Sequence, residues 1–265
     1  MNFFFNCIFF NRRLRYYEDY IRYAQDNGYE IISLEQFYQL PNRRNGKHFI
    51  LRHDIDWQGI STRKLYLAEK EMQVTSTMYF RFSTIDNNLI RELITNRFNV
   101  GFHFETIADY AMENSIDDKS KINLGVVRER FIRETQRFEE ITGCKVRSVC
   151  SHGHPVNKQL GISNNAITEN FDLTKWGILF EAYEQKMYRD DIDCHILDGG
   201  ILKNYGFQYK DNPYDAIDKG YQNIVFVSHP HNWYMSFKKR MILALAWIRG
   251  KAEYSTNREF IRIAK

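Results

Sequence analysis

The sequence contains little of what marks a secreted or redox-active protein. Only four of its 265 residues are cysteine, and no two of them form a CxxC pair, so neither a thioredoxin-like motif nor a zinc ribbon is indicated. No secretory signal is found, because Arg12 and Arg13 follow the apolar stretch at residues 3–10 instead of preceding it. We therefore interpret the cysteines as free thiols and predict a cytoplasmic protein.

Long apolar runs, repeats and linkers are also missing. The stretch at residues 3–10 is too short to cross a bilayer, so we predict no transmembrane segment and interpret this stretch as a strand or docking segment of the folded domain. With only four prolines and no Pro/Gly/Ser-rich tract, the chain shows no domain boundary. We predict one domain over residues 1–265.

Charge and composition narrow the choice of partners. The net charge is +4, and the basic residues are spread along the chain, so we predict no nucleic-acid partner. This mild bias indicates either a solubilising surface or a preference for anionic small substrates such as sugar nucleotides. Aromatic residues make up 15% of the chain. Most of them are expected in the core, but a surplus of Tyr and Trp also suits the apolar faces of sugars.

Apolar runs and helical periodicities alternate along the chain. We predict strands at 29–32, 47–54, 74–80, 100–104, 146–151, 177–180 and 224–228. We predict helices around 14–24, 65–72, 89–94, 124–142 and 238–248. This alternation predicts an α/β fold with parallel strands, and the chain length favours a (β/α) barrel over a small doubly wound sheet. An open sheet is the alternative.

Four of the predicted strands end in two polar residues spaced two apart. The pairs are Asp54 with Asp56, His103 with Glu105, His152 with His154, and His229 with His231. Side chains two apart in a strand point to the same face, and active sites of parallel α/β folds lie at the C-terminal ends of strands. Asp and His ligands from several strands would build a metal site with an open position for water, which metal-assisted hydrolysis requires.

Each pair also has an ordinary structural explanation. An Asp after a strand is most often a helix N-cap, which Asp54 or Asp56 could be, and a single His is more often hydrogen-bonded than a ligand. Gly153 and Pro230 precede His154 and His231 and can break the strand geometry on which the argument depends. The recurrence of the pattern at four strand ends favours the functional interpretation.

At these residues the sequence resembles the polysaccharide deacetylase superfamily, also called the NodB-homology group, which comprises carbohydrate esterase family 4 and its relatives. Residues 51–56 (LRHDID) resemble the HDxD variant of its first motif, residues 101–105 its second, and residues 151–153 occupy the place of its third. Residues 196–200 resemble a later Asp-containing motif, and residues 227–230 resemble the final motif. The resemblance runs in order over most of the chain, from about residue 14 to 235.

The resemblance implies a deformed (β/α) barrel of about seven parallel strands, a divalent metal, most often zinc, and hydrolysis of N- or O-acetyl groups on sugars. It implies Asp54 as the catalytic base, Asp56 and His103 as metal ligands, and His229 as the general acid. Ile107 stands where the family's second motif has another histidine, so we expect His152 as the remaining ligand, with Glu105 as the next choice. The spacing of Asp54 and Asp56 does not separate base from ligand.

The remaining residues complete the expected site. Asp198 is expected to orient His229, and the residues expected to contact substrate are Glu105, His154, His231 and Trp233. We expect a metal-dependent hydrolase that removes an acetyl or other acyl group from an amino sugar or sugar ester in polysaccharide or glycoconjugate biosynthesis. The sugar, its acyl group and its linkage to a nucleotide or lipid are left open. The alternatives are another metallohydrolase, acting on an amide or phosphoester, and an inactive sugar-binding barrel.

Overall fold

The structure is a computed structural model that describes residue 9 and residues 11–200, 206–209 and 211–248. It divides into two compact units. The first unit comprises Met1–Ser76 and Asp191–Lys265, and the second unit comprises Thr77–Asp190. The predicted strand or docking segment at residues 3–10 lies, apart from residue 9, outside the described residues. None of the helices in the described part of the chain combines the length and apolarity needed to cross a membrane.

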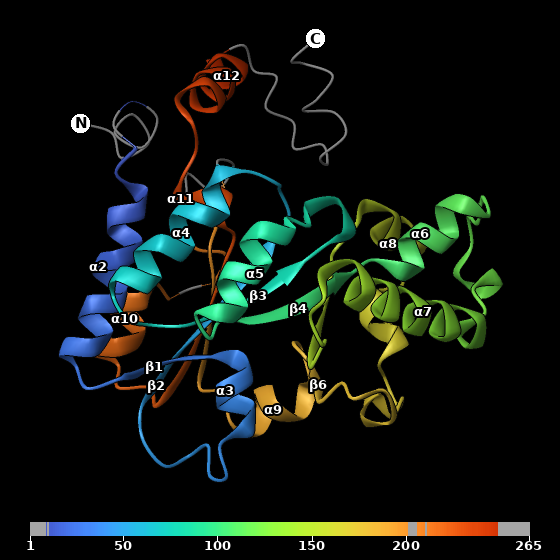
Figure 1. The fold of residues 1–265 in the computed structure, drawn as a ribbon, viewed down its shortest axis with the longest axis horizontal. Helices are drawn as coiled ribbons and strands as arrows, with labels where there is room; N and C mark the ends of the chain where they lie inside the picture. The colour runs from blue at the N-terminus through green and yellow to red at the C-terminus, as the bar shows by residue number, and fades with distance from the viewer. Residues whose placement is uncertain (1–8, 10, 201–205, 210, 249–265) are drawn as a thin grey trace. The chain divides into compact units, whose positions relative to one another are not determined.

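The first unit is built on parallel strands with β2 and β8 in the middle. Its strands are β1 (Glu30–Ser33), β2 (His48–Ile55), β7 (Cys194–Leu197) and β8 (Asn223–Ser228). They pair in the order β1-β2-β8-β7, all parallel. The helices are α2 (Arg13–Asp26), α3 (Leu34–Gln39), α4 (Ile60–Glu71), α10 (Pro213–Asp218), α11 (Pro230–Trp233) and α12 (Phe237–Ile248). Figure 1 shows α2 in blue and α10 in orange lying side by side.

The core of the first unit lies where α2 packs against β2 and β8. All eight residues of β2 are buried, as expected for the interior strand that its continuous apolar run predicts. Helix α2 contributes Tyr17, Ile21 and Ala24 at helical spacing, and these residues belong to one buried cluster with Phe49 and Phe226. This packing fixes the C-terminal ends of β2 and β8, where polar residues follow.

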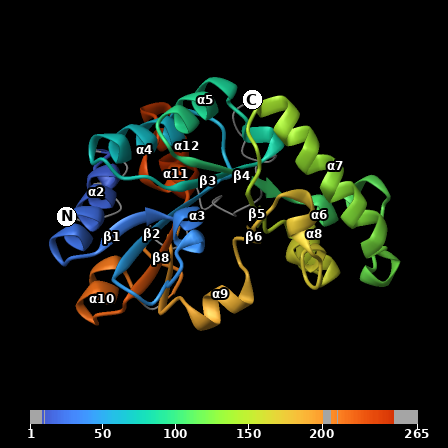
Figure 2. The same ribbon diagram turned by 60° about the horizontal axis from the view of Figure 1, so that its bottom comes forward.

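The second unit repeats the parallel arrangement with different helices. Strands β3 (Thr77–Phe80), β4 (Asn99–Phe104), β5 (Ser148–Ser151) and β6 (Phe180–Glu181) pair in that order, all parallel. The α-helices are α5 (Asn87–Thr95), α6 (Thr106–Glu113), α7 (Leu124–Thr142), α8 (Pro155–Leu160) and α9 (Gln185–Asp190). The 3₁₀ helices are η1 (Phe82–Thr84), η2 (Lys119–Lys121), η3 (Asn164–Ile167) and η4 (Leu173–Trp176). Figure 2 shows α6, α7 and α8 grouped together.

Two glycines explain local features of the second unit. Helix α7 begins after Asn123, whose side chain accepts hydrogen bonds from two backbone N–H groups, and ends at Gly143, which adopts the left-handed conformation with φ of 67°. Gly101 in β4 lies under the Tyr79 ring, so that a Cβ there would come within 2.4 Å of the ring. The absence of a side chain lets the Tyr79 hydroxyl reach across β4 to donate to Ser148 on β5, at 3.0 Å.

The predicted α/β fold is confirmed. All eight described strands pair in parallel and helices connect them, as in a (β/α) barrel. Helix α7 has the predicted bounds. Strand β7 was not predicted, because its four residues include the polar His195. Strand β6 begins at Phe180, later than predicted, because Gly177 has a φ of 77° and closes the 3₁₀ helix η4 just before it.

Candidate active site

Asp54, near the end of β2, is held by a buried arginine on the same strand. Arg52 lies two residues earlier and therefore on the same face. Its Nε donates to Oδ1 of Asp54 at 2.9 Å and its Nη2 donates to Oδ2 at 2.8 Å, with both side chains almost fully buried. This two-pronged pairing fixes the carboxylate and balances its charge in the interior. Helix α4 is capped by Gly59, so the alternative that Asp54 or Asp56 is its N-cap is wrong.

A line of polar contacts in the first unit joins three side chains, Asp198, His229 and Asp56. Asp198 follows β7 and is 1% exposed, and His229 follows β8. The carboxylate of Asp198 accepts the Nδ1–H of His229 at 2.6 Å and the backbone N–H of His229 at 2.9 Å. Nε2 of His229 lies 3.6 Å from Oδ2 of Asp56. The structure thus brings together three predicted site residues from the ends of three strands.

The surrounding carboxylates favour the cationic form of His229. Burial lowers the pKa of His229, but the charge of Asp198 and its hydrogen bond, with smaller contributions from Asp56 and Asp54, outweigh burial and raise this pKa to about 10. The imidazole is therefore protonated at neutral pH. A cationic imidazole that already has a carboxylate on Nδ1 can donate the Nε2 proton to another group.

His231 packs between His229 and Trp57 in the first unit. The rings of His231 and Trp57 stack with centroids 4.7 Å apart and an interplanar angle of 11°. The His229 and His231 centroids are 5.7 Å apart. Burial, followed by the charge of His229, lowers the pKa of His231 to about 4, so His231 is neutral. The ammonium of Lys239 also lies over the Trp57 ring, with Nζ 3.7 Å from the ring centroid.

The burial of Lys239 should make the free energy of unfolding depend on pH. Burial lowers the pKa of Lys239 from 10.5 to about 8. Between pH 8 and 10.5 the unfolded chain keeps a proton that the folded protein has lost, so rising pH favours folding through this group. We expect a gain of about 1–2 kcal/mol after screening by solvent. In urea denaturation, the wild-type protein and the control variant Lys238→Met, which keeps Lys239, should both gain this stability relative to Lys239→Met as the pH rises. A difference between wild type and Lys239→Met that stays constant with pH would contradict the buried state of Lys239.

Trp233 belongs to the core of the first unit. It is 4% exposed and packs against Tyr17, Tyr20 and Phe226, with the guanidinium carbon of Arg13 5.0 Å from its ring centroid. These contacts give its ring a structural role in joining α11 to α2 and β8. Its predicted contact with substrate stays a prediction.

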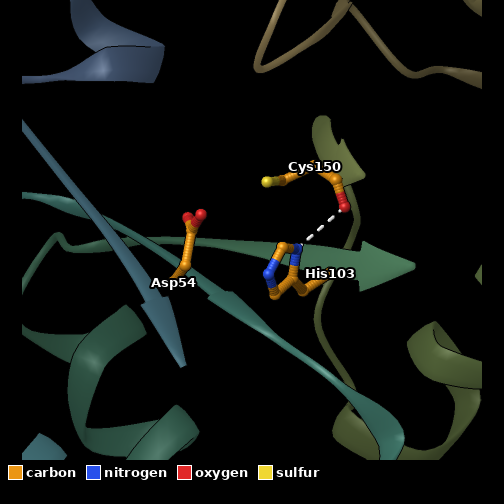
Figure 3. Close-up of side chains that lie close together, drawn as sticks. All are labelled: Asp54, His103 and Cys150. Atoms are coloured by element: carbon orange, nitrogen blue, oxygen red, sulfur yellow. Dashed lines mark hydrogen bonds between the residues drawn. The ribbon is translucent and has the colours of Figure 1, made fainter. Parts of the chain in front are cut away.

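In the second unit, His103 has a fixed tautomer. His103 lies in β4 opposite Cys150 of β5 and is 3% exposed. Its Nδ1 is 3.0 Å from the backbone carbonyl oxygen of Cys150, the contact drawn as a dashed line in Figure 3. A carbonyl oxygen only accepts, so Nδ1 carries a proton, and in the neutral imidazole Nε2 carries the lone pair. Histidine ligands of metals are oriented in this way, with one nitrogen donating to an oxygen and the other facing the metal.

His152 is oriented by a carboxylate instead. Oε2 of Glu105 accepts the Nδ1–H of His152 at 2.9 Å, and Nη2 of Arg81 donates to both oxygens of Glu105 at 2.7 and 2.8 Å. Burial raises the pKa of Glu105, but the hydrogen bond from His152 and the charge of Arg81 outweigh it and lower the pKa to about 2. Glu105 is therefore an ionised acceptor for the Nδ1–H of His152, and in the neutral imidazole the lone pair is on Nε2.

The two imidazoles of the second unit lie together. The ring centroids of His103 and His152 are 5.0 Å apart, edge to face. Asn164, which is 1% exposed, supports this arrangement because its amide donates to the carbonyl of His152 at 2.7 Å and its oxygen accepts the N–H of Ile107 at 2.9 Å. His154 is the N-cap of α8, where its Nδ1 accepts the N–H of Val156 at 3.2 Å. Ile107 itself is fully buried in α6.

The sequence did not identify several residues that hold the site. Arg52 could have been found by its place two residues before Asp54, but Arg81 and Lys239 carry no such signal.

A further missed group is the buried network around Glu69, which joins α2, α4, β2 and β8. Oε1 of Glu69 accepts from His53 Nε2 at 2.6 Å and from the Tyr17 hydroxyl. His53 Nδ1 is 2.7 Å from the Ser228 hydroxyl, next to His229.

Comparison with known proteins finds matches among solved structures, at low sequence identity. No protein-family model matches the chain, and no curated protein matches it. The structure of IcaB from Ammonifex degensii has 14% sequence identity and a TM-score of 0.40, over 62% of this chain and 73% of that one. A mutant of the peptidoglycan deacetylase PdaC from Bacillus subtilis has 11% identity and a TM-score of 0.36, over 79% of this chain and 99% of that one. At this level of similarity, function has to be argued from the side chains of the chain itself.

Proposed function

We propose that this protein is a metal-dependent hydrolase that removes an acetyl group from a sugar. The observation that carries the proposal is the orientation of His103 and His152. An oxygen acceptor holds the Nδ1–H of each ring, and the two rings meet with their lone pairs on Nε2. Two imidazoles oriented in this way suit a catalytic zinc site, where a carboxylate often completes the ligand set.

The proposed metal ligands are the three that the sequence predicts, Asp56, His103 and His152. One carboxylate and two imidazoles form a donor set that suits zinc, and each residue offers one ligand atom. The buried thiol of Cys150 is an alternative donor beside His103. A divalent metal held there would supply a Lewis acid for the acyl carbonyl.

The first unit supplies the proton-transfer groups. We assign Asp54 as the base that takes a proton from the attacking water, with Arg52 fixing its carboxylate. We assign His229 as the acid, because it is cationic at neutral pH and its Nε2–H can protonate the leaving nitrogen or oxygen. Asp198 holds the Nδ1–H and stabilises the imidazolium.

The motif resemblance supports a carbohydrate substrate and a role in polysaccharide or glycoconjugate biosynthesis. The residues of segments 51–56, 101–105 and 227–230 supply the base, the ligands and the acid in the same order as in the polysaccharide deacetylases. The chain departs from the family's second motif at Ile107, where the motif has a histidine. We assign His152 the ligand role of that missing histidine. Glu105, in turn, orients His152 and is assigned that role here.

Acetate release tests this proposal. The zinc-loaded protein should release acetate from N-acetylglucosamine oligomers or O-acetylated xylan, should lose this activity on chelation and should regain it with zinc. Asp54→Asn should retain zinc and lose about 10²–10⁴-fold in kcat. Asp117→Asn changes an exposed carboxylate of the second unit and should retain full activity. Activity that withstands both chelation and Asp54→Asn would disprove the proposal.

A further inference from the structure

Lys239 of α12 is a half-buried cation whose charge is not balanced. Its Nζ lies 3.7 Å from the centroid of the Trp57 ring. Among the residues that the structure describes, Lys239 forms no hydrogen bond and no ion pair, whereas Arg52 pairs with Asp54 and Arg43 pairs with Asp191. An ammonium removed from water without a partner is unfavourable, and an anion bound beside it would offset that cost.

The position of Lys239 connects this charge to the proposed general acid. Trp57 directly follows Asp56, and its ring carries Lys239 and the stacked ring of His231. His231 in turn contacts His229. Nδ1 of His231 is buried and has no hydrogen-bond partner within the described residues. Lys239 and His231 are thus two polar groups of the first unit whose hydrogen bonds are still to be made.

The nearby carboxylates do not neutralise Lys239. Asp198 is committed to the ring and backbone of His229, and Asp56 faces Nε2 of the same histidine. Lys239 contacts Trp57, and His229 contacts His231, which stacks on Trp57. A substrate with only hydroxyl groups would not offset the charge on Lys239, whereas a phosphate or carboxylate would.

We propose that Lys239 recognises an anionic group, a phosphate or a carboxylate, on the sugar whose acyl group is cleaved at His229. This inference rests on the proposed function and names the substrate class as an acylated sugar that carries a negative charge. Trp57 holds the lysine in place, and its ring is covered by Lys239 and His231, so it is a support for the charge and not a platform for a sugar ring. Lys239 is then a specificity-determining residue.

Binding of non-acylated sugars tests this inference without depending on hydrolysis. The probes are glucose 1-phosphate, glucuronate and methyl glucoside, titrated calorimetrically into the zinc-loaded full chain. The wild-type protein should bind at least one anionic probe about tenfold or more tightly than methyl glucoside, and Lys239→Gln should remove that preference. Lys239→Arg should keep it. Lys238→Gln is the matched control, because it removes the same charge from the exposed neighbouring residue, and it should keep the preference as well.

The outcomes separate this inference from the proposed function. A preference for glucose 1-phosphate identifies a phosphate as the recognised group, and a preference for glucuronate identifies a carboxylate. Equal affinity of the wild-type protein for all three probes, or equal losses in Lys239→Gln and Lys238→Gln, would overturn the inference. Acetate release from acetylated sugars would be unaffected by that result. Conversely, a protein that releases no acetate but shows the preference that depends on Lys239 would contradict the proposed function and not the anion recognition.

Discussion

Replacing His103 or His152 by alanine is expected to lower zinc affinity by at least about a hundredfold. Removal of a residue that only orients a ligand typically costs about 10–100-fold, and removal of the ligand itself should cost no less. Glu105→Gln tests the orienting contact separately, because it keeps both imidazoles but weakens the acceptor for His152, and it should lose about 10–100-fold. Affinity is measured by competition with a chromophoric chelator.

His154→Ala is the matched control for this experiment. His154 lies two residues from His152, but its Nδ1 caps α8, so its loss should reduce helix stability slightly and leave zinc affinity unchanged. Asp56→Ala should behave like the two histidine variants. If His103→Ala and His152→Ala bind zinc as tightly as the wild-type protein, the proposed ligands are wrong.

His229→Ala is expected to lower kcat/KM for an N-acetyl sugar by about 10²–10⁴-fold while zinc binding is retained. An amine leaves poorly unless it is protonated, and His229 is the group assigned to protonate it. A 4-nitrophenyl acetate substrate has a good leaving group and should be affected much less. Parallel assays of the two substrates give the ratio that identifies a general acid. Equal losses on both substrates would leave His229 as a structural residue or a ligand.

Asp198→Asn should reproduce part of this effect through His229. Without the carboxylate charge, the pKa of His229 should fall, because Asp198 is the main group that raises it. The histidine signal in an NMR titration of the metal-free variant should therefore titrate at lower pH than in the wild-type protein. Asp19→Asn, an exposed carboxylate on α2, is the control and should leave both the titration and the activity unchanged. An unchanged pKa in Asp198→Asn would exclude its positioning role.

Elements with strong local signals could be predicted from the sequence. The apolar run ending at Asp54 predicted β2, and Gly143 marked the end of α7 because few other residues adopt the left-handed conformation that closes a helix. The short strands β6 and β7 were misplaced or missed. Their burial depends on neighbouring strands, which a local pattern does not show.

The candidate site residues could be predicted as a set, but their contacts could not. The pairs spaced two apart selected Asp54, His103 and His229 as candidates, because active sites of parallel α/β folds lie at the C-terminal ends of strands. The strands do not continue through every pair, since β5 ends at Ser151 and β8 at Ser228. His154 became a helix cap, as the preceding glycine allowed.

Long-range partners account for what the sequence left open. The tautomer of His103 depends on a backbone carbonyl of β5, and this contact requires the strand register. Glu105 was predicted to contact substrate or to be a second-choice ligand, but its carboxylate is held by Arg81, which lies 24 residues earlier in the chain. Lys239 is 182 residues from Trp57 in the sequence (239 − 57), so no motif could connect them.

The zinc X-ray absorption spectrum of the loaded protein tests the central claim most directly. The account predicts one zinc per chain with nitrogen and oxygen neighbours at about 2.0–2.1 Å and the multiple-scattering features of two imidazoles. The proposed ligands are Asp56, His103 and His152, so the spectrum of His152→Ala should show one imidazole fewer. A sulfur neighbour at about 2.3 Å would instead assign Cys150 as a ligand, and a spectrum without imidazole scattering would contradict the proposed centre.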